Sequence, residues 1–435
     1  MKIIGILAGI GLLVASTAQA QETVSSYAGD VEFLLKEFEA KAGGLIKVKG
    51  IDWNAVRVEF TEEVKKVKTD EAQLKLVVRL IGRLQDGHAG IRETKIKWPD
   101  ESQGRKYSGP GVHLVVSGDK VLVRAAYKEA ADVGLMPGRE VVSIDGVPVR
   151  PWLEQRAEEK RDEGSGYSTS QQALYAACHW GLAGWEGTST TFQVKDESGA
   201  LKEVKRTRGG GTNFVPAGRI YPPKELKFVG RQSYGKTPEG MGYIHLRDVP
   251  GNLPAQLDQM LKELGAVPGL ILDMRANGGG GCDHEAVLGR FLAKGLTWKQ
   301  YTGASETPFT GPMVVIVDAG VRSAGETVAG MFKEDGRAYM IGDTPTAGTS
   351  SQKAEITTPS GLFTIRFSVS SNKGRFNGGR GIEGIGVPPH EVVPVKGEDL
   401  LKKEDTLIKR AVELLQKRFP KGAVEYAEAQ VSSDG

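Results

Sequence analysis

Apolar residues recur at helical spacing near the start of the chain. In VEFLLKEF (31–38) and LKLVVRLIGRL (74–84), they fall three or four residues apart, as on one face of a helix. The helical block closes on QDGHAGI (85–91), which predicts a helix end and a turn, followed by a short strand over IRETKIKW (91–98). We therefore predict an N-terminal helical domain over residues 21–106.

The pattern changes to short alternating strands after this block. VHLVVSGDKVLVRAAY (112–127) predicts two strands around a Gly-Asp turn, and AADVGLMPGREVVSIDGVPV (130–149) predicts a short helix, a strand and an Asp-Gly hairpin turn. TTFQVKDESGALKEVKRTR (190–208) predicts one more hairpin. We predict a small β-rich module over 107–207, interrupted by a helical insertion around 150–183.

The rest of the chain alternates strands that are apolar on both faces with helices. The predicted elements are strands in 240–248, 269–277 and 313–320, helices over 253–265, from 283 and over 324–335, and a single amphipathic C-terminal helix over 398–419. Such alternation is typical of a mostly parallel sheet covered by helices on both sides. We predict the α/β fold class, with a core over 208–400 and a C-terminal helix and tail over 401–435.

The first residues resemble an export signal. Lys2 precedes an apolar run (3–14), and Ala-Gln-Ala (18–20) offers a small-residue cleavage site. Cleavage after Ala20 predicts an exported protein, periplasmic or secreted, without stable membrane insertion. The remaining length of about 415 residues suggests two or three domains.

The composition bears on which partners, disulfides and cofactors can be expected. Lys and Arg number 57 against 54 Asp and Glu, a balance of +3 that gives no reason to expect a nucleic-acid partner. The two cysteines, Cys178 and Cys282, are too few for a disulfide framework. An exported chain permits one bridge between them, and two buried free thiols fit the sequence equally well. No His/Cys spacing is typical of a zinc site, so we expect neither a metal nor another cofactor.

A serine follows the apolar run MVVIVDAG, in the segment VRSAGETVAG (321–330). Ser323 stands between a predicted buried strand and a predicted helix. Such a strand-to-helix turn presents a nucleophilic hydroxyl in α/β enzymes, but serine is also a favoured helix N-cap. The stretch alone leaves both interpretations open.

Several segments together carry a family resemblance. They are GYIHLRD (242–248), LILDMRANGGGG (270–281), SAGETVAGMFKEDGRAYMIGD (323–343) and IEGIGVPPHEV (382–392), preceded by the Gly-Leu-Met-Pro-Gly stretch at 134–138. In this order the chain resembles the tail-specific, or C-terminal processing, serine peptidases, in particular their tricorn-core branch. The resemblance implies a crotonase-like (ClpP-type) peptidase core and a PDZ-like module, with a peptide or protein as substrate. It leaves the oligomeric state and the cleavage specificity open.

The resemblance also assigns the reacting groups. It makes Ser323 the nucleophile, with Glu326 three residues later as a supporting residue. The oxyanion hole would combine the backbone N–H of Ala324 with that of Gly278 or Gly279.

The catalytic base is where the sequence departs from the better-known members. Those members carry a lysine 25 residues after the serine, where this chain has Gly348. Gln352 matches their supporting glutamine, but the neighbouring Lys353 should face the other side of a strand.

The tricorn-like branch takes a histidine from its helical N-terminal block, which makes His88 the expected base here. Glu383 matches the acid that orients it. In that branch the acid works through a serine just before the histidine, and this chain has Gly87 there. Direct contact, a bridging water, or Asp86 in place of Glu383 all remain open.

Two function classes compete. The first is an exported serine peptidase that forms an acyl-enzyme, with the PDZ-like module binding a substrate C-terminus as an added strand. The second is a non-catalytic peptide- or ligand-binding protein on a peptidase scaffold, suggested by the missing lysine and by His390 in place of the family's usual aspartate.

Overall fold

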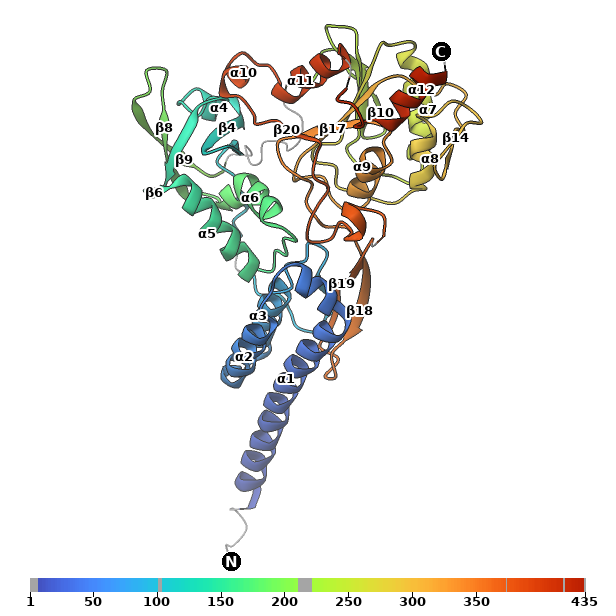
Figure 1. Ribbon diagram of the computed structural model, residues 1–435. Helices are drawn as coiled ribbons and strands as arrows, with labels where there is room; N and C mark the ends of the chain where they lie inside the picture. The colour runs from blue at the N-terminus through green and yellow to red at the C-terminus, as the bar shows by residue number, and fades with distance from the viewer. Residues whose placement is uncertain (1–6, 101–103, 210–220, 373, 418, 434–435) are drawn as a thin grey trace, which may run out of the picture. The chain divides into compact units, whose positions relative to one another are not determined.

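The computed structural model describes residues 7–100, 104–209, 221–372, 374–417 and 419–433 (Figure 1). The first six residues of the predicted signal peptide lie outside this part of the chain. The chain divides into two compact units, which we describe separately. The first unit comprises Met1–Glu101, Lys160–Gly166 and Gln352–Ser370, and the second comprises Ser102–Glu159, Tyr167–Ser351 and Ser371–Gly435.

The first unit combines helices with a small sheet, in the strand order β1-β19-β18. Its elements are α1 (Leu7–Val48), α2 (Trp53–Glu63), a 3-10 turn (Val64–Lys66), α3 (Asp70–Gly82), β1 (Gly90–Thr94), β18 (Ser351–Thr357) and β19 (Phe363–Ser371). The predicted N-terminal helices are therefore confirmed. The predicted strand over 91–98 was too long: it ends at Thr94, whose hydroxyl accepts a hydrogen bond from the Ile96 N–H at 3.1 Å and turns the chain.

Aromatic side chains hold this unit together. Phe38 of α1 and Phe367 of β19 are both fully buried, and their rings meet edge-on with centroids 4.8 Å apart. Such pairs contribute about 0.5–1.5 kcal/mol beyond their buried area. The turn that carries His88 joins α3 to β1, so both of its ends are anchored in this core.

The second unit contains the predicted parallel sheet. Its seven strands lie in the order β10-β11-β12-β13-β16-β17-β20, and from β12 to β20 every pair is parallel. The strands are β10 (Lys227–Val229), β11 (Gln232–Lys236), β12 (Gly242–His245), β13 (Leu270–Asp273), β16 (Met313–Val317), β17 (Tyr339–Gly342) and β20 (Glu391–Val392).

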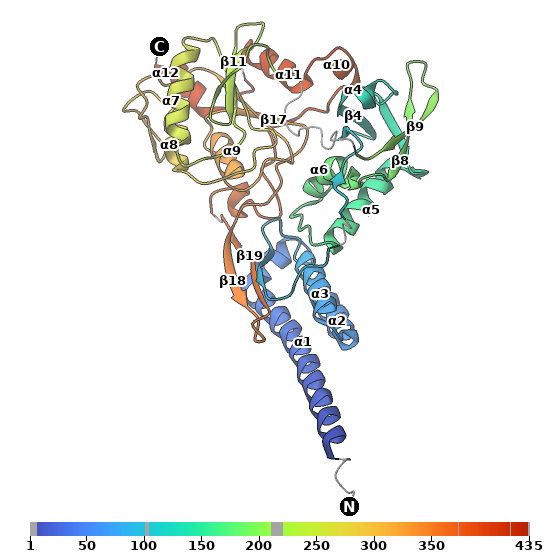
Figure 2. The ribbon, with the colours of Figure 1, turned by 180° about the vertical axis from the view of Figure 1, so that it is seen from behind.

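Helices cover both faces of this sheet. Alternate residues of β13 separate its two sides: Leu270 and Leu272 pack with α7 (Leu253–Leu264), α8 (His284–Gly289) and α9 (Ala324–Glu334), whereas Ile271 packs with α11 (Thr406–Leu415) (Figure 2). This two-sided burial is the reason the strands are apolar at every position. The predicted α/β fold and the three predicted helices that follow its strands are confirmed.

A second, antiparallel sheet belongs to the same unit, in the order β3-β4-β5-β8-β9 with β6 beside β5. Its strands are β3 (Val112–Ser117), β4 (Lys120–Ala126), β5 (Glu140–Ile144), β6 (Val147–Pro148), β8 (Ser189–Lys195) and β9 (Leu201–Thr207), and the helices beside them are α4 (Lys128–Ala131), α5 (Val149–Asp162) and α6 (Ser170–His179). The predicted β-rich region with a helical insertion is present. Its PDZ-like character and the predicted domain boundaries stay predictions.

The predicted single C-terminal helix is wrong. The chain forms α10 (Gly397–Leu401) and then α11, because Asp405 interrupts the helical run. Its Oδ1 atom accepts hydrogen bonds from the N–H groups of Leu407 and Ile408 and so caps α11.

Short elements complete the described fold. They are β2 (Tyr107–Ser108), β7 (Gly184–Trp185), β14 (Thr297–Trp298), β15 (Tyr301–Thr302), α12 (Glu425–Ser433) and two 3-10 turns (Trp180–Leu182 and Asn377–Gly379). Cys178 and Cys282 are both free thiols, which excludes the bridge that export would have permitted. Over the described residues, we find no helix with the combined length and apolarity that crossing a membrane requires.

Candidate active site

The turn between β16 and α9 holds Ser323 in an unusual backbone conformation. Its φ is 59° and its ψ is −130°, a region that residues other than glycine rarely adopt. Ser323 does stand at the N-cap position of α9, but an ordinary N-cap residue has an extended backbone. This strain is typical of a turn that presents a nucleophile, and it favours that interpretation over a plain helix cap.

Glu326, in the first turn of α9, forms hydrogen bonds that stabilise the turn of Ser323. Its carboxylate is fully buried and accepts hydrogen bonds from the Thr346 hydroxyl at 2.6 Å and from the N–H groups of Gly348 at 2.6 Å and Thr349 at 2.7 Å. It also accepts one from the Ser323 N–H at 3.2 Å. Burial raises the pKa of Glu326 to about 8, and these hydrogen bonds oppose that shift. This buried carboxyl therefore joins the turn of Ser323 to residues 346–349.

The glycine run after β13 lies directly against the turn that carries Ser323. The Arg322 N–H donates to the Asn277 carbonyl at 3.0 Å. Gly279 has a φ of 81°, and a Cβ atom added there would stand 2.7 Å from the Cβ of Ser323. Only glycine fits at this contact.

Both predicted oxyanion-hole glycines already have hydrogen-bond acceptors. The Gly278 N–H donates to the Arg247 carbonyl at 3.2 Å, and the Gly279 N–H donates to Asn277 Oδ1 at 2.9 Å. The N–H of Ala324 belongs to the first turn of α9, where an N–H has no acceptor within the helix.

Gly278 and Gly279 form a matched pair for testing this contact. A Cβ atom at Gly278 would meet no atom within 4 Å, whereas one at Gly279 would collide with Ser323. We expect Gly279→Ala to lower kcat/KM for a cleavable peptide by about 100-fold or more, and stability by about 1–3 kcal/mol. Gly278→Ala should keep the stability of the wild type within about 0.5 kcal/mol, because its Cβ atom meets no neighbour. Equal losses of stability in both variants, measured by thermal unfolding, would contradict the close contact at Gly279.

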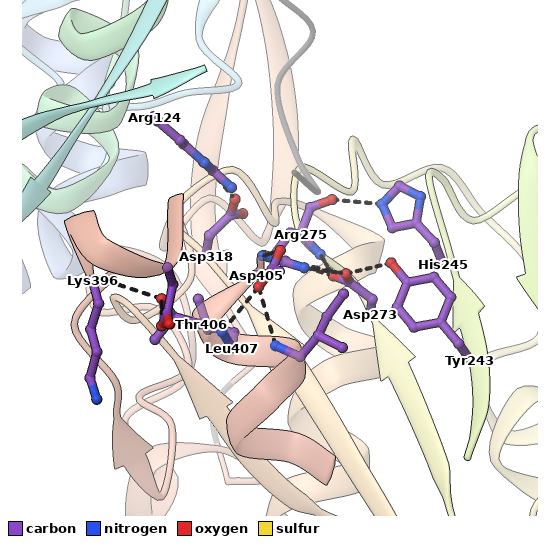
Figure 3. A network of polar contacts seen from close by, with 12 residues as sticks. Arg124, Tyr243, His245, Asp273, Arg275, Asp318, Lys396, Asp405, Thr406 and Leu407 are labelled. Atoms are coloured by element: carbon purple, nitrogen blue, oxygen red, sulfur yellow. Dashed lines mark hydrogen bonds and ion pairs between the residues drawn. The ribbon is translucent and has the colours of Figure 1, made fainter. Parts of the chain in front are cut away.

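A buried polar network fixes the end of β13 from which the glycine run starts (Figure 3). Asp273 is fully buried and accepts hydrogen bonds from the Arg275 guanidinium and, at 2.7 Å, from the Tyr243 hydroxyl. Burial alone would raise the pKa of Asp273, but the charge of Arg275 outweighs burial and lowers it. Arg275 also donates to Asp405 Oδ2 at 2.7 Å, so the same network secures the start of α11.

Glu383, the predicted orienting acid, belongs to the same unit as Ser323. It is fully buried, and its Oε1 atom accepts a hydrogen bond from the Ser168 hydroxyl at 2.8 Å. Its charge contributes to the raised pKa of Glu326. The sequence analysis did not single out Ser168, since a serine in a polar loop 215 positions away carries no local signal of this partner.

His88 and Gln352 belong to the first unit. The His88 N–H donates to Asp86 Oδ1 at 2.8 Å, and Asp86 also accepts from the N–H and the hydroxyl of Ser368. Asp86 therefore joins the His88 turn to β19.

Gln352 is exposed on β18, where its Oε1 atom accepts from the Ser370 hydroxyl at 3.0 Å. The pairing of His88 with Ser323, the roles of Asp86 and Glu383 and the role of Gln352 stay predictions.

Two other histidines have structural roles in the second unit. His245 Nε2 lies 3.1 Å from the carbonyl of Arg275. His390 Nδ1 accepts a hydrogen bond from the Met340 N–H at 2.9 Å, and its ring stacks on Tyr339. Burial lowers the pKa of His390 to about 4, consistent with a neutral ring that accepts this bond.

Matches to known sequences place the protein in the class of serine peptidases. Residues 240–393 match the sequence model of Peptidase family S41, so this part of the chain contains a Peptidase S41 domain. The predicted family resemblance is confirmed.

Known proteins match over much of the chain. It is 22% identical over 363 residues to a carboxyl-terminal-processing protease of Picosynechococcus sp., an alignment that covers 79% of this chain and 78% of that protein. It is 24% identical over 302 residues to a tricorn protease homologue of Streptomyces coelicolor, covering 65% of this chain but only 23% of that longer protein. The solved structure of mature CPAF has a similar fold, with a TM-score of 0.65 and 15% identity, covering 95% of this chain and 98% of that one.

Proposed function

We propose that the protein hydrolyses peptide bonds through an acyl-enzyme on Ser323. The observation that carries this proposal is the strained backbone of Ser323 at the start of α9. The hydroxyl attacks the peptide carbonyl while His88 takes its proton, and His88 then protonates the leaving amine. Water, deprotonated by the same histidine, releases the acid product. Glu383 orients the imidazole, and Glu326 keeps the nucleophile turn in place. Gln352 is a supporting residue by resemblance alone.

The oxyanion of the intermediate would be stabilised by backbone N–H groups. Ala324 supplies one of them, as the first residue of α9. Gly278 or Gly279 supplies the other, and its N–H would exchange its present acceptor for the substrate oxygen. Gly278 is the better candidate of the two, because its bond to Arg247 is the longer, at 3.2 Å against 2.9 Å.

Covalent labelling separates this function from the non-catalytic alternative. A fluorophosphonate probe reacts with an activated serine, so the purified protein should be labelled at Ser323, as located by peptide mass spectrometry. A protein that binds peptides but leaves the probe unreacted would be a binding protein on a peptidase scaffold.

The proposed substrates are chains with a free C-terminus, bound by the β-rich module. β3 is an edge strand of its sheet, and together with α6 it lines a cavity of about 220 Å³. An extended peptide could add to such an edge as another strand. Arg150 also lines the cavity and offers positive charge to a carboxylate. The lining residue Arg124 is buried and paired with Asp318, and Asp343 adds an acidic group. The printed names of several relatives refer to carboxyl-terminal processing, in agreement with this proposal.

Arg150 gives a direct test of carboxylate binding. We expect Arg150→Ala to raise KM for a peptide with a free C-terminus by about fivefold, the effect of about 1 kcal/mol at a partly exposed charge. KM for the C-terminally amidated peptide should not change. Arg139→Ala is the matched control, because Arg139 lies in the same module and pairs with Glu197, as Arg150 pairs with Glu154, but does not line the cavity. Equal changes of KM for both peptides would contradict carboxylate recognition at this cavity.

Export to the periplasm or the medium is part of the proposal that rests on the sequence of residues 1–20 alone.

A further inference from the structure

The first turn of α6 is bonded through side chains to the loops around the nucleophile. Four residues make these contacts, and Ser168, Thr169 and Gln172 among them are more than nine-tenths buried. The hydrogen bonds are Ser168 Oγ to Glu383 Oε1 at 2.8 Å, Thr169 Oγ1 to the Ala347 carbonyl at 2.7 Å, Gln171 Nε2 to the carbonyls of Thr346 and Ile385 at 3.1 Å, and Thr349 Oγ1 to Gln172 Oε1 at 3.0 Å.

These contacts reach both loops on which the proposed site depends. Residues 346–349 form the first loop, whose hydroxyl and N–H groups donate to Glu326. Residues 383–385 form the second loop, which begins with the proposed acid Glu383. The start of α6 therefore binds both the 346–349 loop, which contacts Glu326, and the loop that contains the proposed acid Glu383.

The start of α6 is well suited to this task because it is itself held rigidly. Thr169 is the N-cap of the helix, and its hydroxyl accepts from the Gln172 N–H at 3.2 Å while donating to Ala347. The Ser168 N–H donates to Gln172 Oε1 at 2.7 Å, so the serine that contacts Glu383 is fixed from two sides.

We propose that Ser168 is a positioning residue of the catalytic site, which holds the Glu383 carboxylate in its working orientation. This inference rests on the proposed function, in which Glu383 orients the base. A glutamate side chain has several rotatable bonds, and a hydrogen bond from a fixed hydroxyl selects one orientation of a buried carboxylate. Ser168 reaches Glu383 from the helical insertion of the β-rich module, where no catalytic motif of the sequence lies.

The test is Ser168→Ala, with peptide turnover and fluorophosphonate labelling as readouts. We expect kcat to fall by about 10- to 100-fold while KM stays within about twofold, because the change affects the orientation of the acid and not substrate binding. The labelling rate should fall in parallel. Ser168→Thr retains the hydroxyl and should recover most of the lost kcat.

Ser305→Ala is the matched control. Ser305 is equally buried in the same unit and donates a hydrogen bond to a carboxylate, Asp258 Oδ1, at 2.6 Å, but Asp258 lies on α7 and has no proposed catalytic role. If Ser168→Ala keeps wild-type kcat, or loses no more than Ser305→Ala, the positioning role is wrong. If the wild-type protein itself is not labelled, the proposed function fails first, and the two failures are distinguishable.

Discussion

Ser323→Ala is expected to lower kcat/KM for a cleavable peptide by about 10⁴-fold or more and to abolish fluorophosphonate labelling. The hydroxyl is the atom that forms the acyl bond, and no neighbouring group in the proposed mechanism replaces it. Ser323 is only half-buried, so its removal leaves no core cavity, and stability should change by less than about 0.5 kcal/mol. Retained turnover by the purified variant would end the assignment of the nucleophile.

Ser323→Gly provides a second measurement of the same site. Glycine adopts a positive φ without penalty, so this variant should be inactive and yet more stable than Ser323→Ala, by about 1 kcal/mol. Ser189→Ala, at an exposed serine of β8, is the control for both and should keep full activity. A glycine variant less stable than the alanine variant would contradict the strain that we ascribe to Ser323.

His88→Ala is expected to lower kcat by about 10³-fold or more, whereas Lys353→Ala should change it by less than about twofold. A serine hydroxyl needs a base near neutral pH, and the mechanism assigns that task to His88. Histidine ordinarily titrates near pH 6.5, so the acid limb of kcat/KM should rise between about pH 5.5 and 7.5.

Kinetics of both variants over that pH range decide between the two bases. Lys353 follows Gln352 on β18, and Lys353→Ala tests the alternative base for Ser323. If Lys353→Ala is inactive and His88→Ala retains turnover, the tricorn-like mechanism is wrong and lysine is the base.

The order of the elements and the class of the fold could be predicted from the sequence. Helical spacing in 31–38 and 74–84 and the apolar strands at 269–277 and 313–320 are local patterns, and burial of a strand on both faces imposes them directly on the residues. The same locality explains the errors. Nothing in the amphipathic run over 398–419 shows that Asp405 caps a new helix and binds Arg275, because that partner lies just after the end of β13.

The sequence by itself determined which residues were candidates: a serine before a helix, a glycine run and a glutamate three positions after the serine. Only the tertiary structure decided that Ser323 has a positive φ, that Gly279 lies against its Cβ position and that Glu326 holds the 346–349 loop. Only the tertiary structure brought Ser168 to Glu383. These facts depend on contacts between segments far apart in the chain, and such contacts are set by packing, which leaves no periodic signal in the residues that make them.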